Sequence, residues 1–180
     1  MEITRPSLEG LLLIKPDVFV DDRGCFFESW SKSAFHNIGL DLEFVQDNQS
    51  FSRKDVLRGL HFQTPPYDQG KLVRVVKGKV LDVVVDIRKK SETYGKYFSV
   101  ELSDSDNMMF WIPPGFAHGF LTLENDTIFT YKCTKEYNKS SEGSLLWDDP
   151  TLDIQWGIQS PLVSEKDLKA ASFQHFESQF

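Results

Sequence analysis

The stretch VLDVVVDIR, residues 80–88, decides the fold class. Its apolar members Leu81, Val83, Val85 and Ile87 alternate with a set that contains Asp82, Asp86 and Arg88. This period of two is the pattern of a half-buried β-strand. Similar short runs lie on both sides of it, at Leu72–Val76, Tyr97–Leu102, Met109–Ile112, Gly119–Leu123 and Ile128–Thr134. Many short strands separated by glycine- and proline-containing turns predict a β-sandwich or barrel.

Helical signal is scarce. We expect one short helix at Ser31–Gly39 and another at Ser164–Ala171, the second with Ser164 as N-cap and Asp167 three residues on. No linker or low-complexity tract divides the chain. We therefore expect one domain over residues 1–180, with a C-terminal tail at about 172–180.

Composition limits the classes of partner. The 180 residues are 26% charged and 40% hydrophobic, with a net charge of −7, which is a globular balance that argues against nucleic acid. A small anionic ligand needs only a few local cations and stays compatible with this charge. Cys25 and Cys133 have no metal or disulfide spacing, and the amino terminus has no apolar signal region. We expect a cytoplasmic protein that binds no membrane.

Two of the four histidines stand in motifs. His118 lies in PPGFAHG, residues 113–119, which resembles the second cupin motif, where the histidine is a metal ligand. The stretch that corresponds to the first motif is LRGLHFQ, residues 57–63; Gln63 occupies the second ligand position, and no glutamate follows before Gly78. Two imidazoles without a carboxylate are a poor metal site, so we expect no metal and no cofactor. His36 and His175 are in polar segments and are predicted to be solvated.

Without a metal, His61 is a candidate general base, although a buried structural histidine is an equally good interpretation. Arg58 is three residues away and would face the opposite side of a regular strand, but a bulge at Gly59 would turn both side chains to one cavity. Tyr131 fits either a core aromatic or a general acid. Asp167 fits either a helix cap or the carboxylate that orients His61.

Nine short strings extend this pattern along the chain: DRG at 22–24 with FES at 27–29, FVQDN at 44–48, VLRGLHFQ at 56–63, QGKLVR at 69–74, VVVDIR at 83–88, WIP at 111–113 through GF at 119–120, SEG at 141–143, WDDP at 147–150 and SEKD at 164–167. In this order and spacing they resemble the dTDP-4-dehydrorhamnose 3,5-epimerase family over at least residues 20–167. The resemblance implies a mainly β, cupin-type jelly-roll barrel or sandwich with a few short helices.

The family resemblance also implies an isomerase of dTDP-rhamnose biosynthesis. Such an enzyme inverts carbon-3 and carbon-5 of dTDP-4-dehydro-6-deoxy-glucose without a cofactor, and family members form homodimers. By resemblance, His61 is the base, Asp167 its partner, Tyr131 the acid and Lys71 the neighbour of the sugar keto oxygen. The substrate-binding positions are Arg23, Glu28, Gln46, Asp47, Asn48, Arg58, His118, Tyr137, Glu142 and Lys166, with Tyr137 stacking on thymine.

Several alternatives remain open at this point. Relatives with the same residues invert carbon-3 only or carbon-5 only, and the sequence does not separate these outcomes. It also leaves open whether Arg23 and Glu28 serve their own subunit or its neighbour. Gln49 and Cys25 depart from the family pattern without an assigned consequence. Two rival classes are a metal-dependent cupin enzyme and a non-catalytic sugar-nucleotide-binding barrel.

Overall fold

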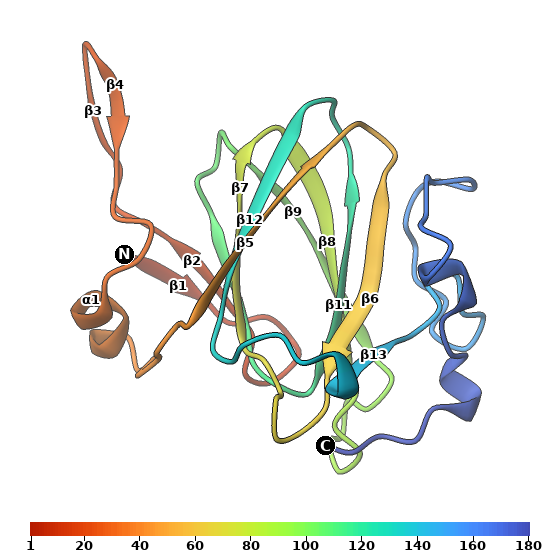
Figure 1. Cartoon of the computed structure of the whole chain (residues 1–180). Helices are drawn as coiled ribbons and strands as arrows, with labels where there is room; N and C mark the ends of the chain where they lie inside the picture. Colours follow the sequence, from red (N-terminus) through yellow and green to blue (C-terminus); the bar gives the residue numbers. More distant parts are fainter.

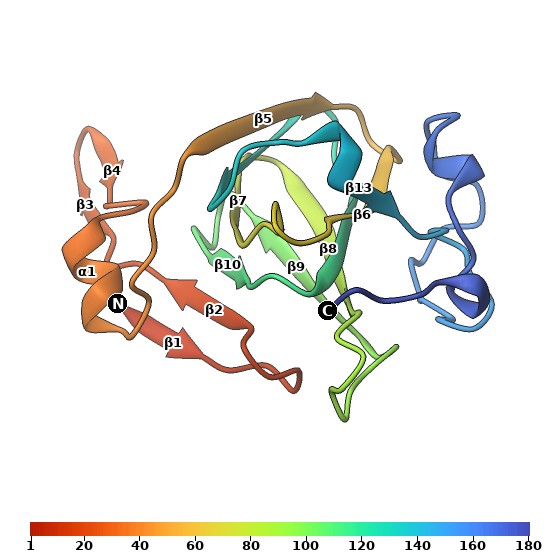
Figure 2. The same ribbon diagram turned by 60° about the horizontal axis from the view of Figure 1, so that its bottom comes forward.

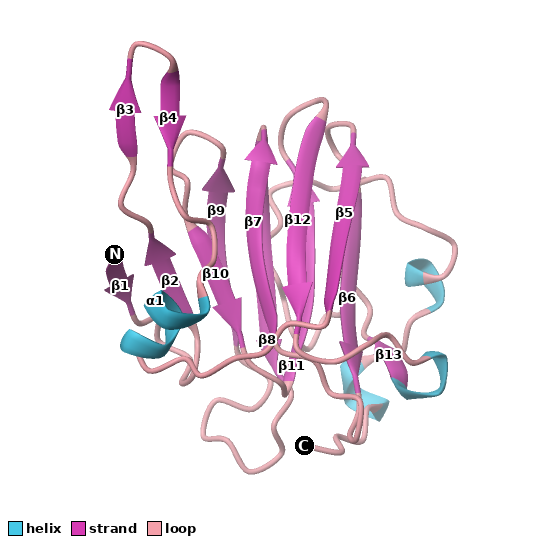
Figure 3. Ribbon diagram, turned by 60° about the vertical axis from the view of Figure 1, so that its left-hand side comes forward, coloured by secondary structure: helices cyan, strands magenta, loops and turns pink.

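Two antiparallel sheets face each other and enclose the interior of a barrel (Figure 1). The computed structural model describes all 180 residues. The six-stranded sheet has the order β1-β2-β10-β7-β12-β5, and the five-stranded sheet has the order β13-β6-β11-β8-β9. A separate hairpin, β3–β4, projects away from the barrel (Figures 1 and 3). The elements are β1 Glu2–Thr4, β2 Leu12–Lys15, β3 Phe19–Asp21, β4 Gly24–Phe26, α1 Lys32–Asn37, β5 Gln46–Ser52, β6 Leu57–Gln63, β7 Lys71–Lys77, β8 Lys79–Asp86, β9 Tyr97–Ser103, β10 Met109–Ile112, β11 Phe116–Thr122, β12 Thr127–Cys133, η1 Lys139–Ser141, β13 Glu142–Ser144, η2 Asp167–Lys169 and η3 Phe173–His175.

All six strand runs identified in the sequence are strands in the structure, and the prediction of a mainly β chain is confirmed. The core between the sheets is apolar and draws on both of them. It includes Val73 and Val75 of β7, Val84 of β8, Phe120 of β11 and Phe129 of β12. Figure 2 looks along this interior, with β5 passing over one side.

Strand β8 differs from the half-buried strand that its alternation predicted. Val83, Val85 and Ile87 belong to a second apolar cluster, which is covered by residues of the C-terminal third such as Leu152 and Trp156. The opposite face of β8 points into the barrel, and Asp82 on it is 0% exposed. The strand is therefore buried on both faces, because the segment after residue 145 packs over the side that would otherwise be solvated.

The first predicted helix is present and the second is not. Ser31 caps α1, accepting a hydrogen bond from the Ala34 N–H at 3.4 Å. The second region contains only η2, one turn of 3-10 helix, so the predicted helix at Ser164–Ala171 is wrong in extent. No helix combines the length and apolar character needed to cross a bilayer.

Candidate active site

An irregularity in β6 brings two predicted site residues to one side. His61 pairs with His118 of β11, but Arg58 pairs with Phe120, so β6 uses three residue steps where β11 uses two. Gly59 sits in this bulge with φ +128, and a Cβ there would lie 2.5 Å from the Cα of Gly119. Only glycine fits this close approach. Arg58 and His61 consequently line the same cavity, as the predicted bulge required.

His61 is paired with a carboxylate from a distant part of the chain. Its Nε2 lies 2.6 Å from Oδ1 of Asp167, whose side chain is only 5% exposed, whereas that of His61 is 35% exposed. Ser164 Oγ accepts the N–H of Asp167 at 3.1 Å and fixes the start of η2. Asp167 is the first residue of η2, but its carboxylate makes no capping hydrogen bond and lies against His61 instead.

The charge state of Asp167 follows from these contacts. Burial by itself would raise its pKa, but the hydrogen bond and charge of His61 and the hydrogen bond from Ser164 together hold the pKa below its ordinary value. The carboxylate is therefore ionised at neutral pH. Because Asp167 occupies Nε2, the Nδ1 atom of His61 is the nitrogen left to accept a proton.

Tyr131 and Lys71 lie across the cavity from His61, on the other sheet. Tyr131 of β12 pairs with Asn48 of β5 and Val73 of β7. The ammonium of Lys71 lies over the Tyr131 ring, 5.9 Å from its centroid. Burial raises the pKa of the Tyr131 phenol, which keeps it protonated, and burial lowers the pKa of Lys71.

A second histidine–aspartate pair lies next to the first. His118 Nε2 is 3.0 and 2.9 Å from the two carboxylate oxygens of Asp82. The side chains are 5% and 0% exposed. Burial raises the pKa of Asp82 and lowers that of His118.

These groups surround a cavity of about 470 Å³. Eight of the fourteen predicted site residues line it: Asn48, Arg58, His61, Lys71, His118, Tyr131, Lys166 and Asp167. An adjoining pocket of about 360 Å³ shares His61, Lys71, Tyr131 and Asn48, and adds three more predicted residues, Gln46, Tyr137 and Glu142. The two volumes form one continuous candidate site around His61 and Tyr131.

The mouth of the site is polar. Tyr137, which is 53% exposed, donates its hydroxyl hydrogen bond to Glu142 at 3.1 Å, and Glu142 binds the Lys166 ammonium at 2.5 Å. Gln46 Oε1 accepts the Tyr137 N–H at 2.8 Å. These contacts hold an aromatic ring, a cation and an amide together at the surface.

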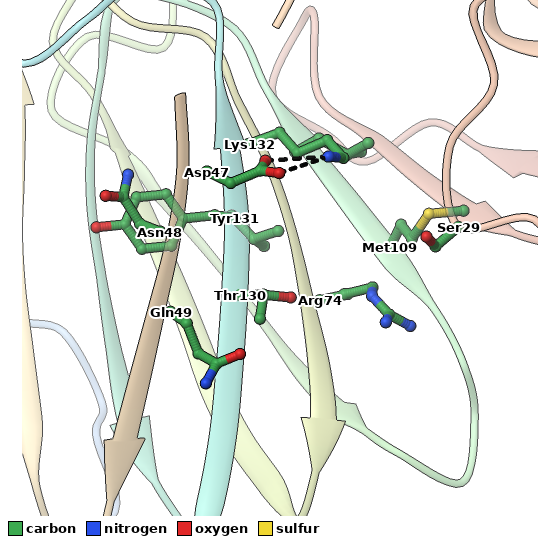
Figure 4. Close-up of a pocket in the computed structure, with 11 residues that line it drawn as sticks. Ser29, Asp47, Asn48, Gln49, Arg74, Met109, Thr130, Tyr131 and Lys132 are labelled. Carbon is green, nitrogen blue, oxygen red and sulfur yellow. Dashed lines mark hydrogen bonds and ion pairs between the residues drawn. The ribbon is translucent and has the colours of Figure 1, made fainter. Parts of the chain in front are cut away.

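Three predicted residues are not brought to the cavity. Arg23 and Glu28 are exposed, and Arg23 binds Asp21 at the tip of the β3–β4 hairpin. Asp47 lies between Gln46 and Asn48 on β5 and faces the other way, where its carboxylate binds Lys132 at 3.0 Å. Asp47 lines a third pocket, of about 290 Å³, on the outer face of the sheet. Figure 4 shows that Asn48 and Tyr131 project to one side of β5 and β12, while Asp47, Thr130 and Lys132 project to the other. The structure therefore corrects the placement of Asp47, because alternation along the strand turns it away from the cavity.

Sequence reasoning missed Asp82 and Ser50. Asp82 is the partner of His118, and Ser50 lines the cavity beside Asn48. A charged residue inside an apolar strand was a usable signal for Asp82, since a buried carboxylate needs a partner. Ser50 had no distinguishing signal, because serine is common on exposed strand faces.

The side chains at the cupin metal position do not fit a metal. The Gln63 amide donates to the backbone carbonyls of Tyr67 and Glu136 and accepts the Asn138 N–H, at 2.6, 3.2 and 2.7 Å. His118 is held by Asp82, and nowhere do three His, Cys, Asp or Glu side chains converge in a way that could hold an ion. Gln63 instead anchors the loop that carries Tyr137.

Fold and site together define a cupin-type jelly-roll barrel with a histidine–aspartate pair facing a tyrosine across one cavity. The model of the dTDP-4-dehydrorhamnose 3,5-epimerase family matches residues 5–175. The chain belongs to this family, and it is an isomerase.

Individual relatives agree with this assignment. A dTDP-4-dehydrorhamnose 3,5-epimerase from Shigella flexneri is 47% identical over 174 residues, covering 96% of both chains. The crystal structure of dTDP-6-deoxy-D-glucose-3,5-epimerase from Legionella pneumophila, in complex with dTDP-4-keto-L-rhamnose, has a TM-score of 0.93 at 42% identity, covering 98% of this chain and 94% of that one. A 3′-monoepimerase from Streptomyces bikiniensis, in complex with dTDP-quinovose, has a TM-score of 0.88 at 32% identity, covering 93% and 85%.

Proposed function

We propose that this enzyme inverts carbon-3 and carbon-5 of dTDP-4-dehydro-6-deoxy-glucose to give dTDP-4-dehydro-L-rhamnose. The observation that carries the proposal is the arrangement of His61 and Tyr131, on opposite sheets around one cavity, with Asp167 2.6 Å from His61. A base and an acid on opposite sides are what inversion at a carbon requires. A barrel that only binds a sugar nucleotide needs no such pair.

His61 removes the proton next to the ketone. Nδ1 takes the proton, the C–H electron pair moves to form an enolate, and Asp167 stabilises the resulting imidazolium through Nε2–H. General base catalysis of this kind typically contributes about 10²–10⁴-fold. Asp167 suits the task because its lowered pKa keeps it anionic through the physiological range.

Lys71 supports the negative oxygen of the enolate. The residue is almost fully buried, at 9% exposed; burial lowers the pKa of Lys71, and the charge of Asp82 acts in the other direction and favours the ammonium. A preorganised cation in a site that excludes water stabilises developing charge more strongly than one in solvent.

Tyr131 returns a proton to the opposite face of the carbon. A phenol with a raised pKa carries its proton at neutral pH and becomes a strong proton acceptor after it has donated.

Arg58 and Lys166 are the cations that would bind the diphosphate of the substrate. Tyr137 stacks on the thymine base, and Gln46 and Asn48 face the polar edge of that base. His118 would contact the sugar from the cavity floor.

Deuterium incorporation tests the proposal. The enzyme is incubated with dTDP-4-dehydro-6-deoxy-glucose in deuterium oxide and the sugar is followed by NMR. We expect label at both carbon-3 and carbon-5. Label at one carbon would make the enzyme a mono-epimerase, and no label from folded protein would remove the epimerase assignment.

The proposal includes a homodimer, with Arg23 and Glu28 acting on the partner's site. Three apolar side chains of the hairpin that carries Arg23 are strongly exposed: Phe19 at 65%, Val20 at 77% and Phe26 at 67%. Arg23 itself lies outside the cavity of its own chain. If the hairpin docks on a second copy of this chain, its exposed apolar side chains are covered and Arg23 reaches the cavity of the partner.

Mixing two inactive variants tests this arrangement. Arg23→Ala is mixed with His61→Ala, and the subunits are exchanged under mild denaturation. If Arg23 acts across the interface, each mixed dimer gains one complete site and activity returns. If Arg23 acts on its own chain, no mixed dimer contains a complete site and activity stays low.

A cytoplasmic location also belongs to the proposal. Cys25 is exposed and Cys133 is buried, and both are free thiols. Free thiols are typical of a reducing compartment.

A further inference from the structure

The loop that carries Tyr137 has no backbone support of its own. It joins β12 to η1, and no hydrogen bond between backbone groups involves residues 135–137. Tyr137 is also 53% exposed, so packing covers only about half of it, and its hydroxyl is tied to Glu142 alone. A ring that stacks on a ligand from such a loop must be fixed by other contacts, or the loop is ordered only when the ligand binds.

Three glutamine side chains supply these contacts. They come from β5, from β6 and from the segment before β7, and they bond the backbone of four consecutive residues, 135–138. The bonds run from Gln69 Nε2 to the Lys135 carbonyl at 2.8 Å, from Gln63 Nε2 to the Glu136 carbonyl at 3.2 Å, from the Tyr137 N–H to Gln46 Oε1 at 2.8 Å and from the Asn138 N–H to Gln63 Oε1 at 2.7 Å.

Gln63 makes the largest share of this clamp. It is 5% exposed, and its Nε2 also donates to the Tyr67 carbonyl at 2.6 Å. Both ends of the amide are therefore engaged, and an amide is needed because it donates two hydrogen bonds and accepts another. A buried amide bonded in this way holds one orientation. Gln63 follows His61 by two residues on β6, so one strand supports both the base and the loop of Tyr137.

We propose that Gln63 and Gln69 are positioning residues for the nucleotide half of the substrate. They fix residues 135–138 in the folded protein, so that the Tyr137 ring is in place before the thymine base arrives. The ordering of the loop then occurs on folding and does not oppose binding. Both glutamines act through Tyr137, and they therefore change affinity for the nucleotide without changing the proton transfers at the sugar. This role rests on the thymine stacking proposed above.

Binding of dTDP by Gln63→Met tests the role. Methionine has a similar length and volume but makes none of the three hydrogen bonds. The Kd for dTDP, measured by calorimetry, should rise about tenfold, which is about 1.4 kcal/mol. The kcat for epimerisation should stay within about twofold of wild type, because the groups that move protons are untouched. Gln69→Ala removes one bond at a half-buried position and should raise the Kd about threefold; it decides the question if Gln63→Met does not fold.

A double-mutant cycle shows whether the effect passes through Tyr137. In a Tyr137→Ala background the ring is gone, so Gln63→Met or Gln69→Ala should change the Kd by less than about twofold. Gln155→Met is the matched control, since the Gln155 amide also donates to a backbone carbonyl, that of Asp153 at 3.1 Å, but in the C-terminal segment. It should leave both Kd and kcat unchanged.

Three results would overturn the assignment: an unchanged Kd in the glutamine variants, an equal rise with and without the Tyr137 ring, or a loss of kcat as large as the rise in Kd. Failure of the proposed stacking is read separately, because Tyr137→Ala by itself would then bind dTDP as tightly as wild type.

Discussion

The two histidine–aspartate pairs of the barrel are neighbours with the same chemistry and different surroundings. His61 and His118 are direct partners across β6 and β11. Each uses Nε2 to bind a nearly or fully buried aspartate. The difference lies in the imidazole: that of His61 is 35% exposed toward the cavity, while that of His118 is 5% exposed.

The aspartates also come from different places. Asp82 lies on β8, the strand next to His118, so that pair is part of the sheet. Asp167 comes from η2, more than a hundred residues after His61, and packs against the barrel from outside. A pair inside the sheet is rigid and dry, which suits the support of a cavity floor. A pair with one open nitrogen and a carboxylate from a separate segment suits proton transfer to a bound ligand.

The largest expected effect is the loss of epimerase activity when His61, the histidine of the cavity-facing pair, is replaced. His61→Asn removes the group that takes the proton and should lower kcat/KM about 10³-fold, which is about 4 kcal/mol in activation free energy. The free energy of unfolding should change by less than about 1 kcal/mol, because the ring is partly exposed. Deuterium exchange at the sugar and urea unfolding measure the two quantities. Near-normal exchange would transfer the role of base away from His61.

The next largest effect is a difference in the free energy of unfolding when the aspartate of each histidine–aspartate pair is removed. Asp82→Ala leaves His118 buried without its partner and should lower the free energy of unfolding by about 3 kcal/mol. Asp167→Ala is the matched variant, and it should lower stability by about 1 kcal/mol, since His61 can be solvated from the cavity. Urea unfolding of both variants makes the comparison. Equal losses would mean that exposure of the imidazole does not distinguish the pairs.

How far the sequence predicts this arrangement differs between the two pairs. His61 and Lys71 stand in strings that resemble one family, and the glycine between Arg58 and His61 indicated the bulge. Asp82 also stands in a strand with clear alternation, but alternation alone does not say which face is covered. The C-terminal segment covers the apolar face of β8, and this packing turns Asp82 inward. Long-range packing of that kind leaves no local pattern.

The β3–β4 hairpin and β5 also show that the sequence does not predict where a side chain points. Arg23 and Asp47 lie in well-matched strings, yet one is on a projecting hairpin and the other faces outward. A string identifies a residue as belonging to a family but does not give the subunit or the face on which it acts. The two alternating faces of β5 explain why Asn48 reaches the cavity and its neighbour does not.

The smallest expected effect is a difference in pH dependence. The pKa of Asp167 is lowered in the folded protein, mainly by His61 acting against burial. Its stabilising contribution is therefore fully present above the unfolded value of about 3.9 and is lost as the pH falls through the lowered folded value. The difference in unfolding free energy between wild type and Asp167→Asn should be constant from about pH 5 to 8 and should shrink below about pH 4. The difference between wild type and Asp82→Asn should have the opposite slope: burial raises the pKa of Asp82, so the folded state binds that proton more tightly than the unfolded state, and wild type gains stability relative to the variant as the pH falls. Urea unfolding across this range measures both slopes, and parallel curves for the two variants would contradict the distinction between a ligand-facing pair and a buried one.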